Sequence, residues 1–165
     1  SDQLVTLGRD DAVECYAVPA ITPDVAIIHA QESDPYGNIR HHGSVFTDRL
    51  LAKTCNTVIV TVDRVVDNAD IRRSPQLTTI PGYLVTMVVE TPYGAHPCGS
   101  HGRYRPDEPH LRQYLEAGEN RRRGSSDTFS DYLARFVSTE DHASYLRVVG
   151  GAAAIEERLG LGQVI

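Results

Sequence analysis

The sequence predicts an α/β fold, with an open, mainly parallel sheet, flanking helices and a helical C-terminal tail. Two nearly continuous apolar runs, residues 24–30 (DVAIIHA) and 57–62 (TVIVTV), have the composition of strands buried on both faces of a sheet. Between them, residues 44–55 show the periodicity of an amphipathic helix that Ser44 could cap. The apolar face of this helix is expected to carry Phe46, Leu50, Leu51 and Cys55. A strand, a helix and a strand in this order form a βαβ unit, whose strands are parallel and whose crossover is right-handed.

A strand on each side of this unit and a series of helices after it complete the predicted fold. Residues 12–18 alternate weakly and predict a short strand, while residues 83–90 (YLVTMVVE) predict a third strong strand. From Asp107 onward, apolar residues recur at helical spacing. The stretches 125–127 (SSD) and 138–141 (STED) have the composition of N-terminal helix caps.

Length and composition limit the class of protein. The 165 residues, of which 41% are hydrophobic, predict a single domain over residues 1–165, with a sheet core in 1–104 and a helical tail in 105–165. The net charge of -6 argues against a nucleic-acid partner held by phosphate contacts. Three scattered cysteines, a polar start and the lack of a long apolar run predict a cytoplasmic protein without a membrane span or a disulfide framework.

Polar loops leave two of the predicted strands at the edge where open α/β sheets usually bind ligands. The first loop, residues 29–44 (HAQESDPYGNIRHHGS), follows the first apolar run, and the second, residues 91–102 (TPYGAHPCGSHG), follows the third strand. Taken alone, the first loop also fits a simple turn, in which Asp34 and Asn38 bond only to their own backbone. By the same reasoning, His29 fits a structural role, and the adjacent His41 and His42 are expected to be solvated.

The same loops contain residues with other possible chemistry. His96, Cys98 and His101 lie within six positions, but no second pair of ligands is evident at zinc-site spacing, so no metal site is expected. Cys98 could be a nucleophile with a neighbouring histidine as base, although nothing nearby would visibly lower its pKa. Glu90 ends a strand and could either face a pocket or meet solvent.

Four segments together resemble the family I CoA-transferases, in particular the α subunit of the glutaconate CoA-transferase branch. These segments are PAITPDVAIIHAQESDPYGNI, NTVIVTVDRVV, IPGYLVTMVVETPYGAHP and YRPDEPHLRQYLEAG. The resemblance extends from about Ala12 to Leu146 and depends most on the DPYGN loop and the later PYGAHP segment. It implies a CoA-transferase-like α/β fold and a hetero-oligomer with a β subunit.

The resemblance also implies how such an enzyme moves CoA between an acyl-CoA thioester and a carboxylic acid, with no covalently bound cofactor. A glutamate that belongs to the β subunit performs nucleophilic attack on the thioester, which gives an acyl anhydride and then a glutamyl-CoA thioester. The nucleophile is therefore not expected on this chain. Residues expected at the substrate and CoA pocket or at the subunit interface are His29, Gln31, Asp34, Gly37, Asn38, Glu90, Gly94, Ala95 and His96.

One difference from the family concerns length, because the family's α subunit is about twice as long. Residues 1–11 do not supply the strands and Gly-rich loop of its N-terminal half, so the chain is expected to correspond to the C-terminal half. Such a half is expected to expose apolar sheet surface. One alternative keeps the fold but changes the reaction: a CoA-ester hydrolase subunit of ring-degradation type, in which water is the acceptor. Another, from a different functional class, is a non-catalytic assembly or CoA-binding module.

Overall fold

A computed structural model describes residues 3–7, 13–17, 20–125 and 127–161 of the chain. The strands are β1 (Gln3–Leu7), β2 (Val13–Ala17), β3 (Val25–Ser33), β4 (Ile39–Arg40), β5 (Thr57–Val65) and β6 (Met87–Glu90). The α-helices are α1 (Asp48–Thr54), α2 (Asn68–Arg73), α3 (Glu108–Arg122), α4 (Asp127–Tyr132), α5 (His142–Val148) and α6 (Ala152–Leu159). Short helical turns are η1 (Pro75–Leu77), η2 (Gly82–Leu84) and the π-helical η3 (Leu133–Val137).

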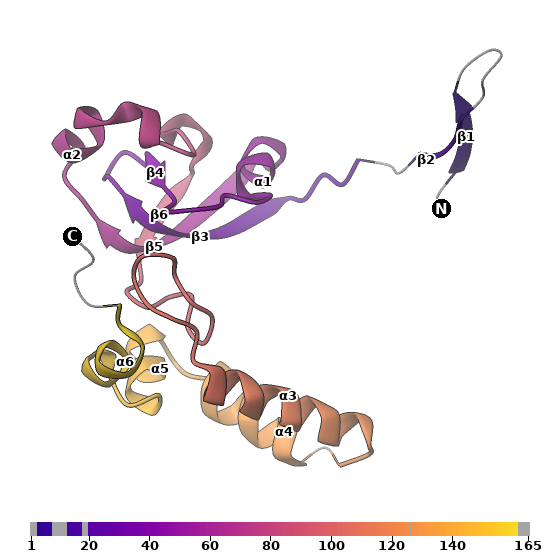
Figure 1. The fold of residues 1–165 in the computed structure, drawn as a ribbon, viewed down its shortest axis with the longest axis vertical. Helices are drawn as coiled ribbons and strands as arrows, with labels where there is room; N and C mark the ends of the chain where they lie inside the picture. Colours follow the sequence, from indigo (N-terminus) through magenta and orange to yellow (C-terminus); the bar gives the residue numbers. More distant parts are fainter. Residues whose placement is uncertain (1–2, 8–12, 18–19, 126, 162–165) are drawn as a thin grey trace.

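The predicted βαβ unit is confirmed as β3, α1 and β5. In the four-stranded sheet the order is β4-β3-β5-β6, and β3 and β5 are parallel, with Ile28 opposite Val60. Strand β6 is also parallel to β5, while the short β4 runs antiparallel to β3. The carboxyl ends of β3, β5 and β6 therefore meet at one edge, and the loop leaving β6 leads from this edge to helices α3 to α6 (Figure 1).

One face of the sheet is buried, and the prediction that both faces are buried is wrong for the described residues. The core is made mainly of β-branched and small side chains and includes Ala26, Ile28, Ala30, Val58, Val60, Val62 and Ile80. The alternate residues of β3 point away from this core, and the side chain of Ile27 remains 74% exposed. An alternating strand buries both sets of side chains only if each face has a cover.

Two further predictions need correction near the sheet. The strand predicted for residues 83–90 begins only at Met87, because Pro81 starts the turn η2, where Leu84 N–H donates to the Pro81 carbonyl. Helix α1 begins at Asp48 without a side-chain cap, so Ser44 is not its cap. Phe46 lies before the helix and is 89% exposed, so it does not contribute to the apolar face.

The C-terminal tail is helical as predicted. Asp107 caps α3 through a bond from His110 N–H to Oδ1, and Asp141 caps α5 through a bond from Ser144 N–H. The helices bury two clusters of their own, one around Tyr104 and Ile155 and the other around Ala117, Tyr132 and Phe136. Among the helices of the described ranges, none combines the length and hydropathy needed to cross a membrane.

Candidate functional site

A buried carboxylate, Asp63, organises the carboxyl edge of the sheet. It lies near the end of β5 and is 4% exposed. Ser100 donates its hydroxyl to Oδ2 at 2.6 Å, and the backbone N–H of Tyr93 donates to Oδ1 at 3.0 Å. Because Tyr93 and Ser100 both belong to the loop that leaves β6, Asp63 fixes this loop to the neighbouring strand.

Gln31 extends the Asp63 network to the first polar loop. Its Nε2 donates to Ser100 Oγ at 3.1 Å, and its Oε1 accepts the backbone N–H of His42 at 2.8 Å. Both the nitrogen and the oxygen of the Gln31 amide therefore have partners, and Ser100 passes the chain of bonds on to the Asp63 carboxylate. The two polar loops expected to meet at the sheet edge are joined by this side chain.

His29 lies beside this network, and its ring nitrogen Nε2 has no hydrogen-bond partner. Its Nδ1 lies 2.9 Å from Thr61 Oγ1, and the Thr61 hydroxyl can also donate to the Ile28 carbonyl at 3.3 Å. Thr61 can therefore either donate to Nδ1 or accept from it, so the neutral ring has a partner at Nδ1 in both tautomers. Nε2 is buried without a hydrogen bond and lies 3.6 Å from Asp63 Oδ2.

The second loop approaches His29 so closely that only glycine fits at position 94. A Cβ on Gly94 would lie 2.9 Å from His29 Cε1 and 2.8 Å from Thr91 Oγ1, which is shorter than real Cβ contacts. The next residue, Ala95, donates its N–H to the Tyr104 hydroxyl at 3.0 Å. Burial, followed by the charge of Asp63, raises the pKa of Tyr104, so this hydroxyl remains protonated.

The predicted residues Asp34, Gly37 and Asn38 form a self-contained turn beside β3. Asp34 is fully buried and accepts the backbone N–H of Asn38 at 2.9 Å and side-chain amides from Asn38 and Asn68. Burial raises the pKa of Asp34, but these hydrogen bonds outweigh it and hold the pKa below its usual value. Gly37 has a φ of +82°, which L side chains rarely adopt. Every described contact of Asp34 is local to this turn or to α2.

Glu32 and the two adjacent histidines line the outer side of the first loop. Hydrogen bonding from His42, opposed by burial and assisted by Arg64, lowers the pKa of Glu32 to about 2. The prediction that both histidines are solvated is wrong for His41, whose side chain is 5% exposed and bonds Thr79 Oγ1 at 2.7 Å. His42 is partly exposed, as expected, and lies 3.4 Å from Glu32.

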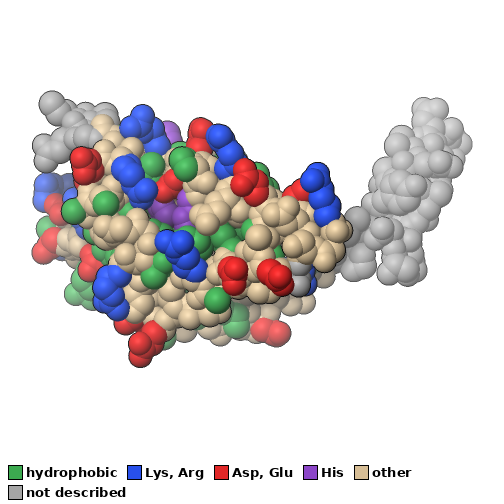
Figure 2. All heavy atoms as spheres, turned by 90° about the horizontal axis from the view of Figure 1, so that it is seen from below, with side chains coloured by type: hydrophobic (Ala, Val, Ile, Leu, Met, Phe, Trp, Pro, Cys, Tyr) green, Lys and Arg blue, Asp and Glu red, His purple; other side chains and the backbone are tan. Residues whose placement is uncertain are grey.

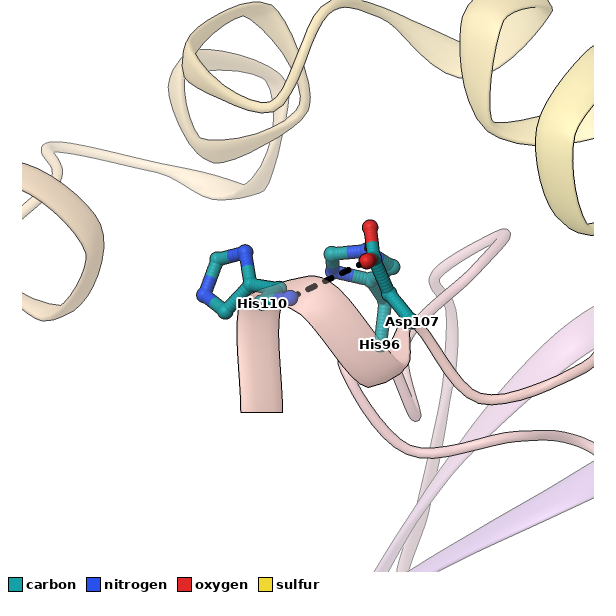
Figure 3. A group of neighbouring side chains, drawn as sticks. All are labelled: His96, Asp107 and His110. Atoms are coloured by element: carbon teal, nitrogen blue, oxygen red, sulfur yellow. Dashed lines mark hydrogen bonds and ion pairs between the residues drawn. The ribbon is translucent and has the colours of Figure 1, made fainter. Parts of the chain in front are cut away.

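Two predicted residues lie away from Asp63. Glu90 is exposed at the end of β6, where its carboxylate accepts the backbone N–H of Val65 at 2.8 Å. His96 turns toward the helical tail: Nε2 lies 3.2 Å from Asp107 Oδ2, and Nδ1 lies 2.6 Å from the Tyr145 hydroxyl. Figure 3 shows His96 beside Asp107 at the start of α3, with His110 on the first turn of that helix.

The structure thus brings His29, Gln31, Gly94 and Ala95 together around a carboxylate that sequence reasoning missed. Asp63 directly follows the apolar run at residues 57–62, and this position was the available signal. Ser100 was missed as well, since a serine inside a Gly- and His-rich loop carries no distinguishing pattern.

Comparison with known proteins identifies the family to which the chain belongs. The model of a family described as coenzyme A transferase matches residues 7–91, which is more than half of the chain. The chain belongs to the coenzyme A transferase family. The α subunit of glutaconate CoA-transferase from Acidaminococcus fermentans is 36% identical over 149 residues, covering 88% of this chain and 45% of the relative.

Two further matches bear on fold and reaction in this CoA-transferase family member. The crystal structure of the Acidaminococcus fermentans glutaconate CoA-transferase superimposes with a TM-score of 0.83 at 33% identity, covering 93% of this chain and 47% of that chain. The IpdA subunit of a cholesterol ring-cleaving hydrolase from Rhodococcus jostii is 30% identical over 125 residues, covering 74% of this chain and 40% of the relative. The CoA-transferase-like α/β fold is confirmed, and the chain spans less than half the length of each of these relatives.

Proposed function

We propose that this chain forms part of the α subunit of a CoA-transferase and acts with a β subunit that supplies the nucleophilic glutamate. Membership of the family and similarity to the α subunit of a glutaconate CoA-transferase support this proposal. The substrates would be an acyl-CoA thioester and a carboxylic acid, in a cytoplasmic hetero-oligomer.

The observation that carries the proposal is the unpaired Nε2 of His29 beside Asp63. A buried ring nitrogen without a partner is costly, and a polar substrate group would satisfy it. With a proton on Nε2, His29 could donate to a negative oxygen. A donor held in a fixed position is suited to stabilising an oxyanion.

The proposed reaction divides the transfer of CoA into two pairs of displacement steps. The partner's carboxylate attacks the thioester carbonyl, the C–S bond breaks, and CoA leaves as a thiolate while an anhydride forms. The thiolate then attacks the glutamyl carbonyl of the anhydride, which releases the first acid as its carboxylate and leaves CoA on the partner as a thioester. The acceptor acid reverses both steps. His29 would hold the oxygen on which charge develops, and Gln31 and Ser100 would orient Asp63.

The other predicted residues have less direct parts in this proposal. Gly94 and Ala95 would form the wall opposite His29. Asp34, Gly37 and Asn38, together with Glu90, would shape the surface facing the partner, and His96 would fix the second loop to the tail. These roles are proposed for a complex of this chain with a β subunit, on the basis of the contacts that the residues make within this chain.

Hydrolysis of a CoA ester is the second candidate, favoured by the similarity to the cholesterol ring-cleaving hydrolase subunit. It would use the same edge of the sheet with water as acceptor. Comparing turnover in the presence and absence of an acceptor acid distinguishes the two reactions.

The test is turnover of acyl-CoA thioesters by the chain assembled with its β subunit. His29→Asn should lower kcat by about 100-fold, the usual loss when an oxyanion donor is removed. His101→Asn is the matched control, because His101 is an exposed histidine of the second loop, and it should retain turnover. Unchanged turnover in an assembled His29→Asn enzyme would refute the role of His29, and CoA binding without turnover in the unmodified assembly would indicate a binding module.

A further inference from the structure

Three metal-ligating side chains converge where the second loop meets the helical tail. His96, Asp107 and His110 are each buried, and each offers one ligand atom within 4.8 Å of the other two (Figure 3). We infer that these residues form a binding site for Zn²⁺ or a similar divalent transition metal. The inference does not depend on the proposed transferase activity, because the three side chains make no contact with Asp63 or His29 among the described residues.

One pair of ligand atoms already has the separation that a small tetrahedral ion needs, and the third atom lies within 4.8 Å of both. Zinc bonds to imidazole nitrogen and carboxylate oxygen are about 2.0–2.2 Å long, so two ligands of one ion lie about 3.4 Å apart. His96 Nε2 and Asp107 Oδ2 are already 3.2 Å apart. Two imidazoles and one carboxylate match the ligand preferences of zinc and other first-row transition metals rather than those of Mg²⁺ or Ca²⁺.

Both histidines have the outer hydrogen bonds that metal ligands usually need. The Tyr145 hydroxyl bonds His96 Nδ1 at 2.6 Å, and the Tyr132 hydroxyl lies 2.9 Å from His110 Nε2. Tyr132 therefore leaves His110 Nδ1 as the ring nitrogen for an ion.

A change of tautomer would prepare His96 for metal binding. When Nε2 gives up its hydrogen, Nδ1 can donate to the Tyr145 hydroxyl. That hydroxyl can in turn donate to the His96 carbonyl, which lies 3.3 Å away. The partners for both tautomers are therefore in place.

The cluster also has space for a fourth ligand. A cavity of about 360 Å³ is lined by Asp107, His110, Gln113 and Arg158, among others. Figure 2 views the molecule from the side of the tail and shows histidine side chains in a depression bordered by basic side chains. Arg158 lies 3.5 Å from Asp107 Oδ2 and is half exposed, so an ion would displace it from that oxygen. Arg158 would keep its bonds to the Ala154 and Val149 carbonyls.

This ligand set differs from the one that the sequence analysis considered and rejected. Cys98 and His101 are exposed and do not join the cluster, and the second half of the site comes from Asp107 and His110 instead. These residues follow His96 by 11 and 14 positions, a spacing without a recognisable zinc motif. A bound ion would tie the loop after β6 to helix α3.

The test is zinc binding by the full chain after treatment with a chelator. One equivalent of Zn²⁺ should remain after gel filtration, as measured by elemental analysis, whereas Mg²⁺ should not be retained. Asp107→Asn should weaken zinc binding at least tenfold while preserving the fold, because asparagine caps helices as well as aspartate. His110→Gln should abolish one-to-one binding, and its side-chain amide can still bond Tyr132.

The matched control is the double variant Cys98→Ser, His101→Ala, which removes the two exposed ligand types nearby and should bind zinc as the unmodified chain does. Tyr132→Phe should weaken binding about tenfold, the usual effect of losing an outer hydrogen bond on a metal ligand. Circular dichroism and the melting temperature without metal would show that each variant is folded. A folded unmodified chain that retains no zinc, or retention lost in the control but not in Asp107→Asn, would overturn the inference.

Discussion

Two buried carboxylates, Asp63 at the sheet edge and Asp107 at the start of the tail, have similar hydrogen-bond partners, although Arg158 also lies 3.5 Å from Asp107, and they leave their histidines in different states. They are 4% and 5% exposed, and each accepts one backbone N–H and one side-chain donor. His96 is held between Asp107 and Tyr145, whereas His29 keeps Nε2 unpaired 3.6 Å from Asp63. Both rings bond a hydroxyl through Nδ1, so the two pairs differ in whether the carboxylate bonds the opposite ring nitrogen.

Substituting the two carboxylates should lower the free energy of unfolding by very different amounts, and this is the largest effect we predict. Asp63→Ala leaves the Ser100 hydroxyl and the Tyr93 N–H without an acceptor, and should lower the free energy of unfolding by about 3 kcal/mol. Asp107→Asn keeps a capping oxygen and lets His96 change tautomer, so it should cost less than about 1 kcal/mol. Urea unfolding of both variants measures the comparison, and equal losses would contradict it.

Two glycines, one in each region, sharpen the comparison. Gly94→Ala places a Cβ against His29 and Thr91 and should cost about 2 kcal/mol of stability through forced displacement of the loop. Gly118→Ala, inside α3, places its new Cβ more than 4 Å from every atom beyond its chain neighbours and the adjoining helix backbone, and should stabilise the protein by about 0.5–1 kcal/mol. Thermal unfolding would give shifts of opposite sign, and a neutral Gly94→Ala would show that the loop is free to move.

A smaller effect on stability depends on pH and arises at Glu32, in strand β3 of the sheet. Glu32 has a folded-state pKa of about 2, below its ordinary value of 4.5, so its ionised form stabilises the folded chain above about pH 4.5. This stabilisation is lost as the pH falls toward 2. Because His42 and Arg64 are partly exposed, Glu32→Gln should cost only about 1 kcal/mol at pH 7.

The measurement is the difference in unfolding free energy between the Glu32→Gln variant and the unmodified chain, followed from neutral pH down toward the folded-state pKa of Glu32. The difference should shrink as the pH falls. A constant difference over this range would mean that the ion pairs do not cause it.

The parts of the fold predicted correctly are those specified by local patterns. The βαβ unit follows from two β-branched runs separated by one helix, and the cap at Asp141, within the stretch 138–141, follows from a side chain that bonds three residues ahead. The strand pattern alone did not predict the exposed face carrying Ile27, because an apolar strand has the same sequence whether or not its second face is covered. The half-length resemblance did predict exposed apolar sheet surface.

The site was less predictable because its contacts are distant in sequence. Asp63 and Ser100 are 37 residues apart, and His96 and Tyr145 are 49 apart, so no local window contains both partners. The prediction for His41 was wrong for the same reason, since its burial depends on Thr79. The roles of the pocket residues suggested by resemblance remain predictions, to be tested in the assembled enzyme.

The amide of Gln31 has a consequence for the order in which the chain folds. Its oxygen bonds a partner 11 residues away, while its nitrogen bonds one 69 residues away. Closing the longer segment costs more chain entropy, so the two halves of one side chain should become ordered at different stages. We expect the bond to His42 to form with the early sheet and the bond to Ser100 to form only when the second loop docks, which makes position 31 a natural place for a kinetic probe of the last folding step.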